Sequence, residues 1–426
     1  MSETDNPNNP VDQIEQVAAN GLLHRRAFLK TGALVASATP FLSAKAAPPE
    51  VDSWSTVPGR PPEAYGNRSE FESDVTRLAG FSPPALGAGA SRAPLGNLEG
   101  IITPSALHFE RHHNGIPNID PAEHRLLIHG LVDKPLIFDM EALSRYPLVS
   151  RIQFLECSGN SRALDQAQPV PGSAQSLHGL LSCSEWTGVP LSILLDEAGV
   201  QTEGKWVLAE GADSSLMTRS IPMSKIRDDA IVAIYQNGER LRPGNGYPMR
   251  LFLPGWEGNT SVKWLRRLKV TAEPTMTRDE TSKYSDLQPD GTAQLFSFQM
   301  GVKSVITSPS GEQTMRGPGL YQISGIAWTG AGSISRVEVS ADGGRTWGEA
   351  ELTEPVLSKA LTRFRMPWRW NGEPVILQSR AIDETGAVQP TRTFLLNERG
   401  PQYGYHNHAI QSWQISANGE VSNVYA

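Results

Sequence analysis

Residues 153–162 read QFLECSGNSR, and the rest of the chain is organised around this stretch. A hydrophobic run from Phe154 ends on Cys157, and a Ser-Gly-Asn turn follows at once. In an exported protein, a thiol at the end of a buried strand and before a donor-rich loop suits a disulfide, a nucleophile or a metal ligand. The local sequence leaves these three chemistries open.

The chain has only two cysteines, Cys157 and Cys183. Neither belongs to a CxxC or CxxCH arrangement, so iron–sulfur, structural zinc and covalent haem sites are poorly supported. In an exported protein the two thiols could pair with each other. For Cys183 the favoured interpretation is a buried structural residue.

Length and composition limit the fold and the partners. The chain has 426 residues, which is long enough for two domains of ordinary size. With 39 glycines and 32 prolines it suits a loop-rich protein with much sheet rather than a helical bundle. The net charge of −7 and the absence of a Lys/Arg-rich run argue against nucleic acid as a partner. No apolar run of about eighteen residues follows the N-terminal region, so we expect no membrane anchor.

Residues 1–46 are predicted to be a Tat-type signal peptide. Residues 24–30 (HRRAFLK) resemble the twin-arginine signal, although His24 stands where Ser or Thr is usual. An apolar run at 31–42 and the small residues around Lys45 predict cleavage near Ala46. A Sec signal or a short anchor is the alternative. We therefore expect a periplasmic protein that is exported already folded.

The pattern after the leader divides into an arm and two domains. Residues 47–98 are rich in Pro, Gly, Ala and Ser and predict an extended arm over its own or a neighbouring subunit, with a short helix near 69–78. Residues 99–275 predict a mixed α+β domain. Its expected elements are strands at 125–131, 150–156, 249–253 and 262–270, helices at 139–146 and 191–198, and a hairpin at 230–241.

Residues 276–400 alternate apolar and polar side chains between turn signals and predict an immunoglobulin-like β-sandwich. Residues 401–426 are predicted to be a C-terminal tail, whose segment 403–408 could reach back over the active site or meet a partner. The expected strands of the sandwich lie at 320–328, 335–340, 348–352, 362–369 and 375–383.

Six segments resemble the molybdopterin sulfite oxidase family and occur in the family's order. They are FERHH (109–113), FLECSGN (154–160), EWTGVPL (185–191), GYPMR (246–250), VKWL (262–265) and SADGGRTW (340–347). The sequences of residues 111–131 and 154–160 are most similar to the family's SoxC branch. The resemblance implies a sulfite oxidase-like molybdopterin-binding domain followed by a dimerisation domain with the immunoglobulin-like fold.

The resemblance also implies roles for individual residues. Cys157 would be the thiolate ligand of a molybdenum–molybdopterin cofactor, whose pterin dithiolene supplies further sulfur ligands. Four positions match the residues that surround the substrate in the family: Arg111, Arg162, Trp186 and Tyr284. Fixed cations and a phenol donor suit an anionic substrate. A single Arg is more commonly a surface charge, and Trp186 could simply pack.

Five further positions match the cofactor-binding residues of the family: His113, Asn245, Arg250, Ser261 and Lys263. Asn245 stands where the sulfite oxidases carry His, and His112 stands where Asn is usual. The loop 255–261 would offer backbone N–H groups to the pterin phosphate, as a nest does. A lone histidine is most often structural, so His113 depends on its neighbours for a role.

The function that the resemblance implies is the oxidation of a reduced sulfur compound in the periplasm. The substrate would be the sulfane sulfur of a cysteine persulfide on a carrier protein in thiosulfate oxidation. Free sulfite is the close alternative, and a cofactor-free binding or assembly subunit is the alternative from another class. Because the chain has no haem motif, electrons would leave through a c-type cytochrome subunit of the SoxD type. A homodimer through the C-terminal domain, within a heterotetramer, is also implied.

Overall fold

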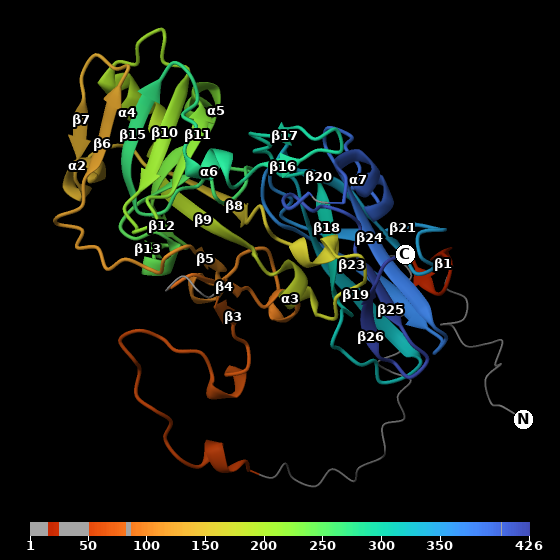
Figure 1. Ribbon diagram of the computed structural model, residues 1–426. Coiled ribbons are helices and arrows are strands. Elements are labelled where there is room, and N and C mark those ends of the chain that lie inside the picture. The colour runs from red at the N-terminus through yellow and green to blue at the C-terminus, as the bar shows by residue number, and fades with distance from the viewer. Residues whose placement is uncertain (1–15, 25–50, 82–86, 402) are drawn as a thin grey trace, which may run out of the picture.

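The computed structural model describes residues 16–24, 51–81, 87–401 and 403–426. The twin arginine, the apolar run and the expected cleavage site lie outside the described residues. Strands dominate, the helices are short, and two parts of the chain lie side by side (Figure 1). No helix among these described ranges is long and apolar enough to cross a membrane.

The first part, over about residues 78–281, contains two five-stranded sheets and a small three-stranded sheet. The first sheet has the order β11 (Thr218–Pro222), β10 (Trp206–Gly211), β15 (Leu265–Thr271), β6 (Leu126–Gly130) and β7 (Leu136–Phe138). The second contains β13 (Glu239–Arg240), β12 (Ile231–Gln236), β9 (Leu181–Pro190) and β8 (Val149–Glu156), with β14 (Arg250–Phe252) beside β12. The small sheet joins β3 (Leu78–Phe81), β4 (Gly89–Arg92) and β5 (Glu110–His112).

Short helices pack on these sheets, and local signals fix where they begin and end. The helix α2 (Met140–Ser144) begins at Asp139, whose Oδ1 accepts a hydrogen bond of 2.8 Å from the Ala142 amide. The helix α4 (Leu191–Ala198) follows Pro190 and ends at Gly199, which has φ +70°. Leucines of α4 share one core with the first sheet and with α5 (Met223–Asp228). The remaining helices of this part are α3 (Ala174–His178) and α6 (Arg278–Thr281).

The second part consists of two larger sheets that enclose a core rich in tryptophan. One contains β1 (Gln16–Ala18), β2 (Leu22–Leu23), β23 (Thr362–Trp370), β19 (Gly319–Trp328) and β18 (Lys303–Ser308), with β22 (Glu351–Thr353) beside β23. The other has the order β21 (Gly348–Glu349), β20 (Ile334–Ser340), β24 (Val375–Asp383), β25 (Ser412–Ile415) and β26 (Val421–Val424). The helix α7 (Arg392–Arg399) and the pair β16 (Asp286–Leu287) and β17 (Ala293–Gln294) lie beside them (Figure 1).

The core of the second part continues into the first. Phe154 of β8 and Cys183 of β9 belong to the same buried cluster as Trp328 and Trp413. Phe154 and Cys183 lie opposite each other in the antiparallel pair β8–β9. The strand that leads to Cys157 is therefore anchored in both parts of the molecule.

Most strands predicted in the two domains are confirmed within a few residues, and three expectations are wrong. The predicted strand 348–352 is divided at Ala350, because β21 pairs with β20 whereas β22 pairs with β23. The predicted helix at 69–78 is a single 3-10 turn at Glu70–Glu72, since this segment has no buried face that packing could stabilise. The predicted tail includes β25 and β26, which complete a sheet.

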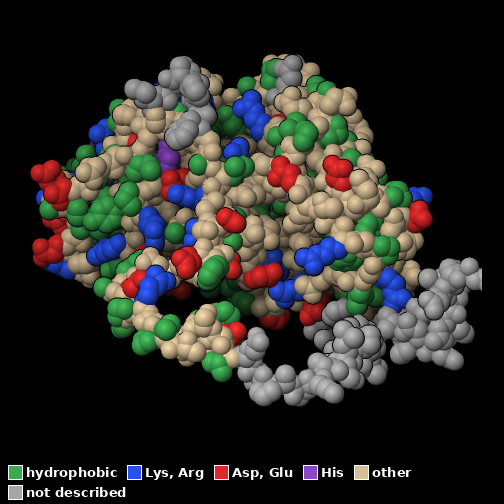
Figure 2. Space-filling view, turned by 90° about the horizontal axis from the view of Figure 1, so that it is seen from below, with side chains coloured by type: hydrophobic (Ala, Val, Ile, Leu, Met, Phe, Trp, Pro, Cys, Tyr) green, Lys and Arg blue, Asp and Glu red, His purple; other side chains and the backbone are tan. Residues whose placement is uncertain are grey.

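The arm before the first part is largely exposed. Trp54 is 76% exposed and Phe71 is 89% exposed. Tyr65 contacts the body, where its hydroxyl donates to Glu239 at 2.9 Å. Figure 2 shows acidic and basic side chains interspersed over the described part of one face of the molecule.

Candidate functional site

The strand β8 places Cys157 at a fixed point. It pairs with β9 along its whole length, from Val149 opposite Gly188 to Glu156 opposite Leu181. Beyond the strand, the Cys157 amide donates to Leu180 O at 3.0 Å, and Cys157 O accepts from the Asn160 amide at 2.8 Å. The chain thus turns sharply after the cysteine, whose side chain lines a pocket.

The Cys157 thiol is free, and so is Cys183, so the disulfide alternative is wrong. Burial raises the pKa of the Cys157 thiol, whereas a backbone hydrogen bond from Gly159 and the charge of Arg111 act to lower it. Among the described residues, no group of three or more His, Cys, Asp and Glu could hold a metal ion.

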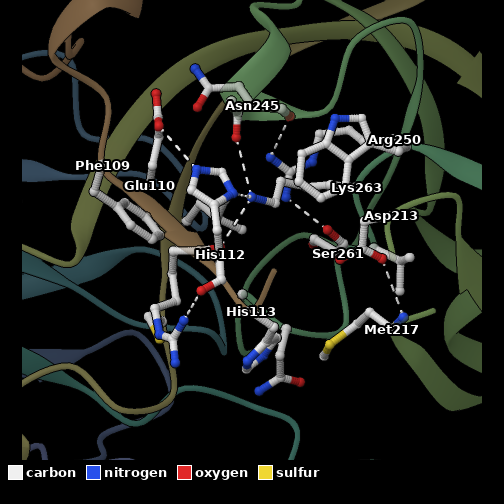
Figure 3. A pocket seen from close by; sticks show the side chains of 18 of the residues that line it. Phe109, Glu110, His112, His113, Asp213, Met217, Asn245, Arg250, Ser261 and Lys263 are labelled. Carbon is white, nitrogen blue, oxygen red and sulfur yellow. Dashed lines mark hydrogen bonds and ion pairs between the residues drawn. The ribbon is translucent and has the colours of Figure 1, made fainter. Parts of the chain in front are cut away.

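A pocket lies beside Cys157 (Figure 3), and its empty space, open solvent included, is about 690 Å³. Its wall includes eight of the ten predicted site residues. These are Arg111, His113, Cys157, Asn245, Arg250, Ser261, Lys263 and Tyr284. Segments far apart in the sequence therefore meet around one cavity.

Two cations in the pocket wall, the buried Arg250 and the half-buried Lys263, form no ion pair with any described residue. The guanidinium of Arg250 donates to Asn245 O at 3.0 Å and to Ser261 O at 2.7 Å, and its Nε has no partner. The Lys263 amine donates to Arg111 O at 3.0 Å and to Gly244 O at 3.2 Å. Burial lowers the pKa of Arg250 to about 9 and that of Lys263 to about 7. An anionic group in the pocket would supply the missing negative charge.

A polar chain behind Lys263 fixes the orientation of His112. The Lys263 amine lies 2.8 Å from His112 Nδ1, and His112 Nε2 lies 3.0 Å from Glu110 Oε2 (Figure 3). Because a lysine ammonium only donates, Nδ1 accepts from it and Nε2–H donates to the carboxylate. Burial acts to raise the pKa of Glu110, but hydrogen bonds from His112 and Arg77 lower it to about 2. Glu110 was not predicted from the sequence, although it lies within the FERHH segment.

A second group of residues surrounds Tyr284. Its hydroxyl lies 3.0 Å from His113 Nε2, and burial raises its pKa well above 10.0, so the phenol keeps its proton. Burial and the charge of Arg111 lower the pKa of His113 to about 4, so this imidazole is neutral. The guanidinium of Arg219 lies 4.8 Å from the centre of the Tyr284 ring. Arg219 is itself paired with Glu257 at 3.0 Å and Glu280 at 2.9 Å.

Two predicted site residues do not line the pocket. Trp186 is fully buried; its ring stacks on Phe252 at 4.6 Å and lies 5.1 Å from the Arg250 guanidinium. Its Nε1 donates to Gln153 O at 3.2 Å, so it packs behind the wall and supports Arg250. Arg162 is exposed in the turn after Cys157 and approaches Gly404. The position of neither side chain supports direct contact with a substrate in the pocket.

The second part of the chain holds the residue before Cys157. Glu156 is buried, and its carboxylate accepts from Trp328 Nε1 at 2.6 Å, Asn160 Nδ2 at 2.9 Å and Lys303 Nζ at 3.3 Å. The predicted tail segment also lies here, because the His406 amide donates to Ser158 O at 2.8 Å. None of these interdomain contacts has a local signal in the sequence.

One protein thiol beside cations that form no ion pair suits an anionic cofactor that a thiolate helps to hold. Comparison with known families agrees. Residues 113–278 match the model described as the oxidoreductase molybdopterin binding domain, and residues 295–412 match the Mo-co oxidoreductase dimerisation domain.

The chain belongs to the molybdopterin sulfite oxidase family, and it is SoxC-like. The crystal structure of the sulfane dehydrogenase SoxCD from Paracoccus pantotrophus has a TM-score of 0.86 and 45% identity, covering 88% of this chain and 98% of that one. Human mitochondrial sulfite oxidase is 30% identical over 318 residues, which is 68% of this chain and 58% of the relative. Tomato NADH nitrate reductase is 32% identical over 349 residues, which is 71% of this chain and 38% of that protein. The chain thus spans only part of these curated relatives.

The residues present fit a molybdopterin cofactor. The pterin carries a phosphate, and Arg250 and Lys263 are cations of the pocket wall without an acidic partner. The dithiolene sulfurs would supply the metal ligands that the protein lacks around Cys157. Arg250 Nε and Asn259 Oδ1 are buried polar atoms of the wall without a partner, as expected where a polar cofactor binds.

Proposed function

We propose that the chain is a molybdopterin-dependent dehydrogenase that oxidises the sulfane sulfur of a cysteine persulfide held on a carrier protein, in thiosulfate oxidation. The observation that carries the proposal is the meeting of a single free thiol, Cys157, with the unpaired cations Arg250 and Lys263 in one pocket. The likeness to a sulfane dehydrogenase supports the choice of substrate.

When bound, the molybdenum cofactor supplies two-electron oxygen-atom transfer. Cys157 would hold the metal, and Arg250 and Lys263 would bind the phosphate of the pterin, with Asn245 and Ser261 fixing the Arg250 fork through their carbonyl oxygens. Arg111 would orient an anionic substrate near the thiol, since its side chain lines the same pocket as Cys157. Tyr284 would hold a proton at its phenol oxygen beside the neutral His113.

The placement of the arginines favours a persulfide over sulfite. Free sulfite carries up to two negative charges and requires several fixed cations. Among the described residues of the wall, Arg250 and Lys263 would be engaged by the pterin phosphate, which leaves Arg111 for the substrate, and Arg162 does not line the pocket. A persulfide carries at most one charge, so a single arginine suffices to orient it. Oxidation of free sulfite is therefore the second candidate.

The setting of the enzyme is also part of the proposal. The two cysteines are not in a CxxCH arrangement, so a separate c-type cytochrome subunit of the SoxD type would accept the electrons. The dimerisation domain would form a homodimer, and with the cytochrome a heterotetramer. We propose export by the Tat pathway to the periplasm. We also interpret the first part as a mixed α+β domain and the second as an immunoglobulin-like sandwich.

Metal analysis and turnover test the proposal together. The purified chain is expected to contain about one equivalent of molybdenum, and Cys157→Ser is expected to abolish turnover while Cys183→Ser, the matched control, keeps it. Less than about a tenth of an equivalent of molybdenum would favour the cofactor-free binding subunit.

Cytochrome reduction distinguishes the two substrates. A persulfide-loaded carrier protein is expected to reduce a c-type cytochrome through this enzyme faster than free sulfite does. Faster reduction by sulfite would overturn the sulfane proposal and leave the oxidoreductase assignment in place.

A further inference from the structure

A short β-hairpin lies within the segment interpreted as the leader, directly before the twin arginine. The strands β1 and β2 pair with each other, and the chain reverses at Asn20 and Gly21, which have φ +56° and +86°. Ala18 pairs with Leu22, so three residues close the hairpin, and Asn and Gly are the residues that adopt positive φ most readily in such turns. This hairpin lies against the second part of the chain (Figure 1).

Backbone and side-chain hydrogen bonds fix the hairpin on β23 and on the turn 341–347. The Arg369 amide donates to Gly21 O at 2.8 Å, and Trp368 Nε1 donates to Asn20 O at 2.8 Å. Asn20 Nδ2 donates to Ala341 O at 2.8 Å, and the Ala19 amide donates to Thr346 Oγ1 at 3.1 Å. The hairpin thus extends a sheet at the edge of β23.

Apolar packing accompanies these bonds. Leu22 is fully buried in the core that contains Trp368, and Val17 and Ala18 pack against the same core. The approach is close at Gly348, where an added Cβ would lie 2.8 Å from Val17 Cγ2. A two-stranded hairpin of this length is at best marginally stable in water, so its structure depends on the surface beneath it.

We propose that the end of β23, the turn 341–347 and Gly348 form a docking groove for the leader's own hairpin in the unprocessed chain. The groove is built from residues 341–369, so it exists only after most of the chain has been made and its second part has folded. Docking therefore holds the leader on a finished fold until the leader is removed. The name leader rests on the proposed export, but the docking interaction does not.

Hydrogen–deuterium exchange on the full-length chain tests the docking. The variant Gly21→Val would place a Cβ 2.0 Å from Arg369 O at a residue with positive φ, so it should displace the hairpin without altering the groove. Exchange over residues 366–371 is expected to become about tenfold faster, which corresponds to the loss of roughly one hydrogen bond with its packing. The control Gln16→Val adds the same side chain at the exposed start of β1 and should leave exchange unchanged.

A groove-side variant makes the test independent of hairpin strain. Thr346→Val removes the acceptor of the Ala19 amide on an exposed turn, and exchange over residues 17–22 is expected to rise severalfold. Equal exchange in the wild type, Gly21→Val and Thr346→Val would overturn the proposal. N-terminal sequencing of the exported chain tests the leader separately: an uncut N-terminus would refute processing, whereas the exchange result would stand.

Discussion

The buried lysine Lys303 should be one of the most sensitive positions for stability outside the pocket. Its side chain is 1% exposed and comes from β18 in the second part of the chain. The amine donates to Glu156 at 3.3 Å, Ser161 Oγ at 2.7 Å and Asn407 O at 2.6 Å. The perturbation is Lys303→Met, which keeps the apolar stem and removes the charge and all three donors.

The contacts set the size of the effect. Breaking a buried ion pair by removing one partner typically costs about 3–5 kcal/mol, because the remaining charge stays buried. Here Glu156 keeps Trp328 and Asn160 as donors, so the lower end applies, about 3 kcal/mol. For a domain of ordinary size this corresponds to a fall in the melting temperature of roughly 6–12 °C.

Denaturant unfolding measures this loss, and Lys359→Met is the matched control. Lys359 also pairs with a carboxylate, at Asp229, but that carboxylate keeps Lys225 as a partner, so the expected loss is about 1 kcal/mol. A double-mutant cycle with Glu156→Gln should recover about 1–2 kcal/mol of the Lys303→Met loss. A loss under about 1 kcal/mol for Lys303→Met, with no coupling to Glu156, would refute the reasoning.

Other perturbations test the pocket and the buried histidines. Lys263→Met should lower the molybdenum content of the purified chain at least about tenfold, measured by metal analysis, because the phosphate would lose one of the two cations of the pocket wall that form no ion pair. Tyr284→Phe should lower kcat about 10²-fold or more with a small change in cofactor content, since it removes the phenol proton beside His113. Arg111→Ala should raise the KM for the sulfur substrate at least about tenfold, whereas Arg162→Ala should change it less than about threefold, in steady-state kinetics. Burial lowers the pKa of His178 from 6.5 to about 3, so the unfolded chain binds a proton that the folded chain does not, and the free energy of unfolding should fall as pH drops from about 6.5 towards 3. His178→Gln should weaken this pH dependence, measured by unfolding curves at several pH values. An unchanged slope of the unfolding free energy against pH would count against the role of His178.

Local signals in the sequence were sufficient for much of the fold. Asp139 and Gly199 mark helix ends that the structure contains, and the Asn237-Gly238 turn joins β12 to β13. Each depends on a few neighbouring residues, which a single sequence displays. The helix predicted near 69–78 is absent. Its cap, Ser69, is present, but no buried face follows that packing could stabilise.

The pocket wall could be predicted only through motifs, and its supports could not be predicted at all. The motifs predicted that Arg250 and Lys263 belong to one site. They predicted Trp186 and Arg162 in the same site, but these two side chains do not line the pocket. The pairing of Glu156 with Lys303 joins residues 147 positions apart. Nothing in either neighbourhood signals the other, because such a contact depends on how the two parts of the chain pack.

The continuous core that joins Phe154 and Cys183 to Trp328 has a consequence for anyone who recombines this protein with its relatives. The dimerisation domain cannot simply be exchanged for that of a relative, since a junction near residue 290 would divide a single hydrophobic cluster. A chimera that imports a foreign C-terminal half must also import the matching faces of β8 and β9, or the hybrid will misplace the cysteine on which its chemistry depends.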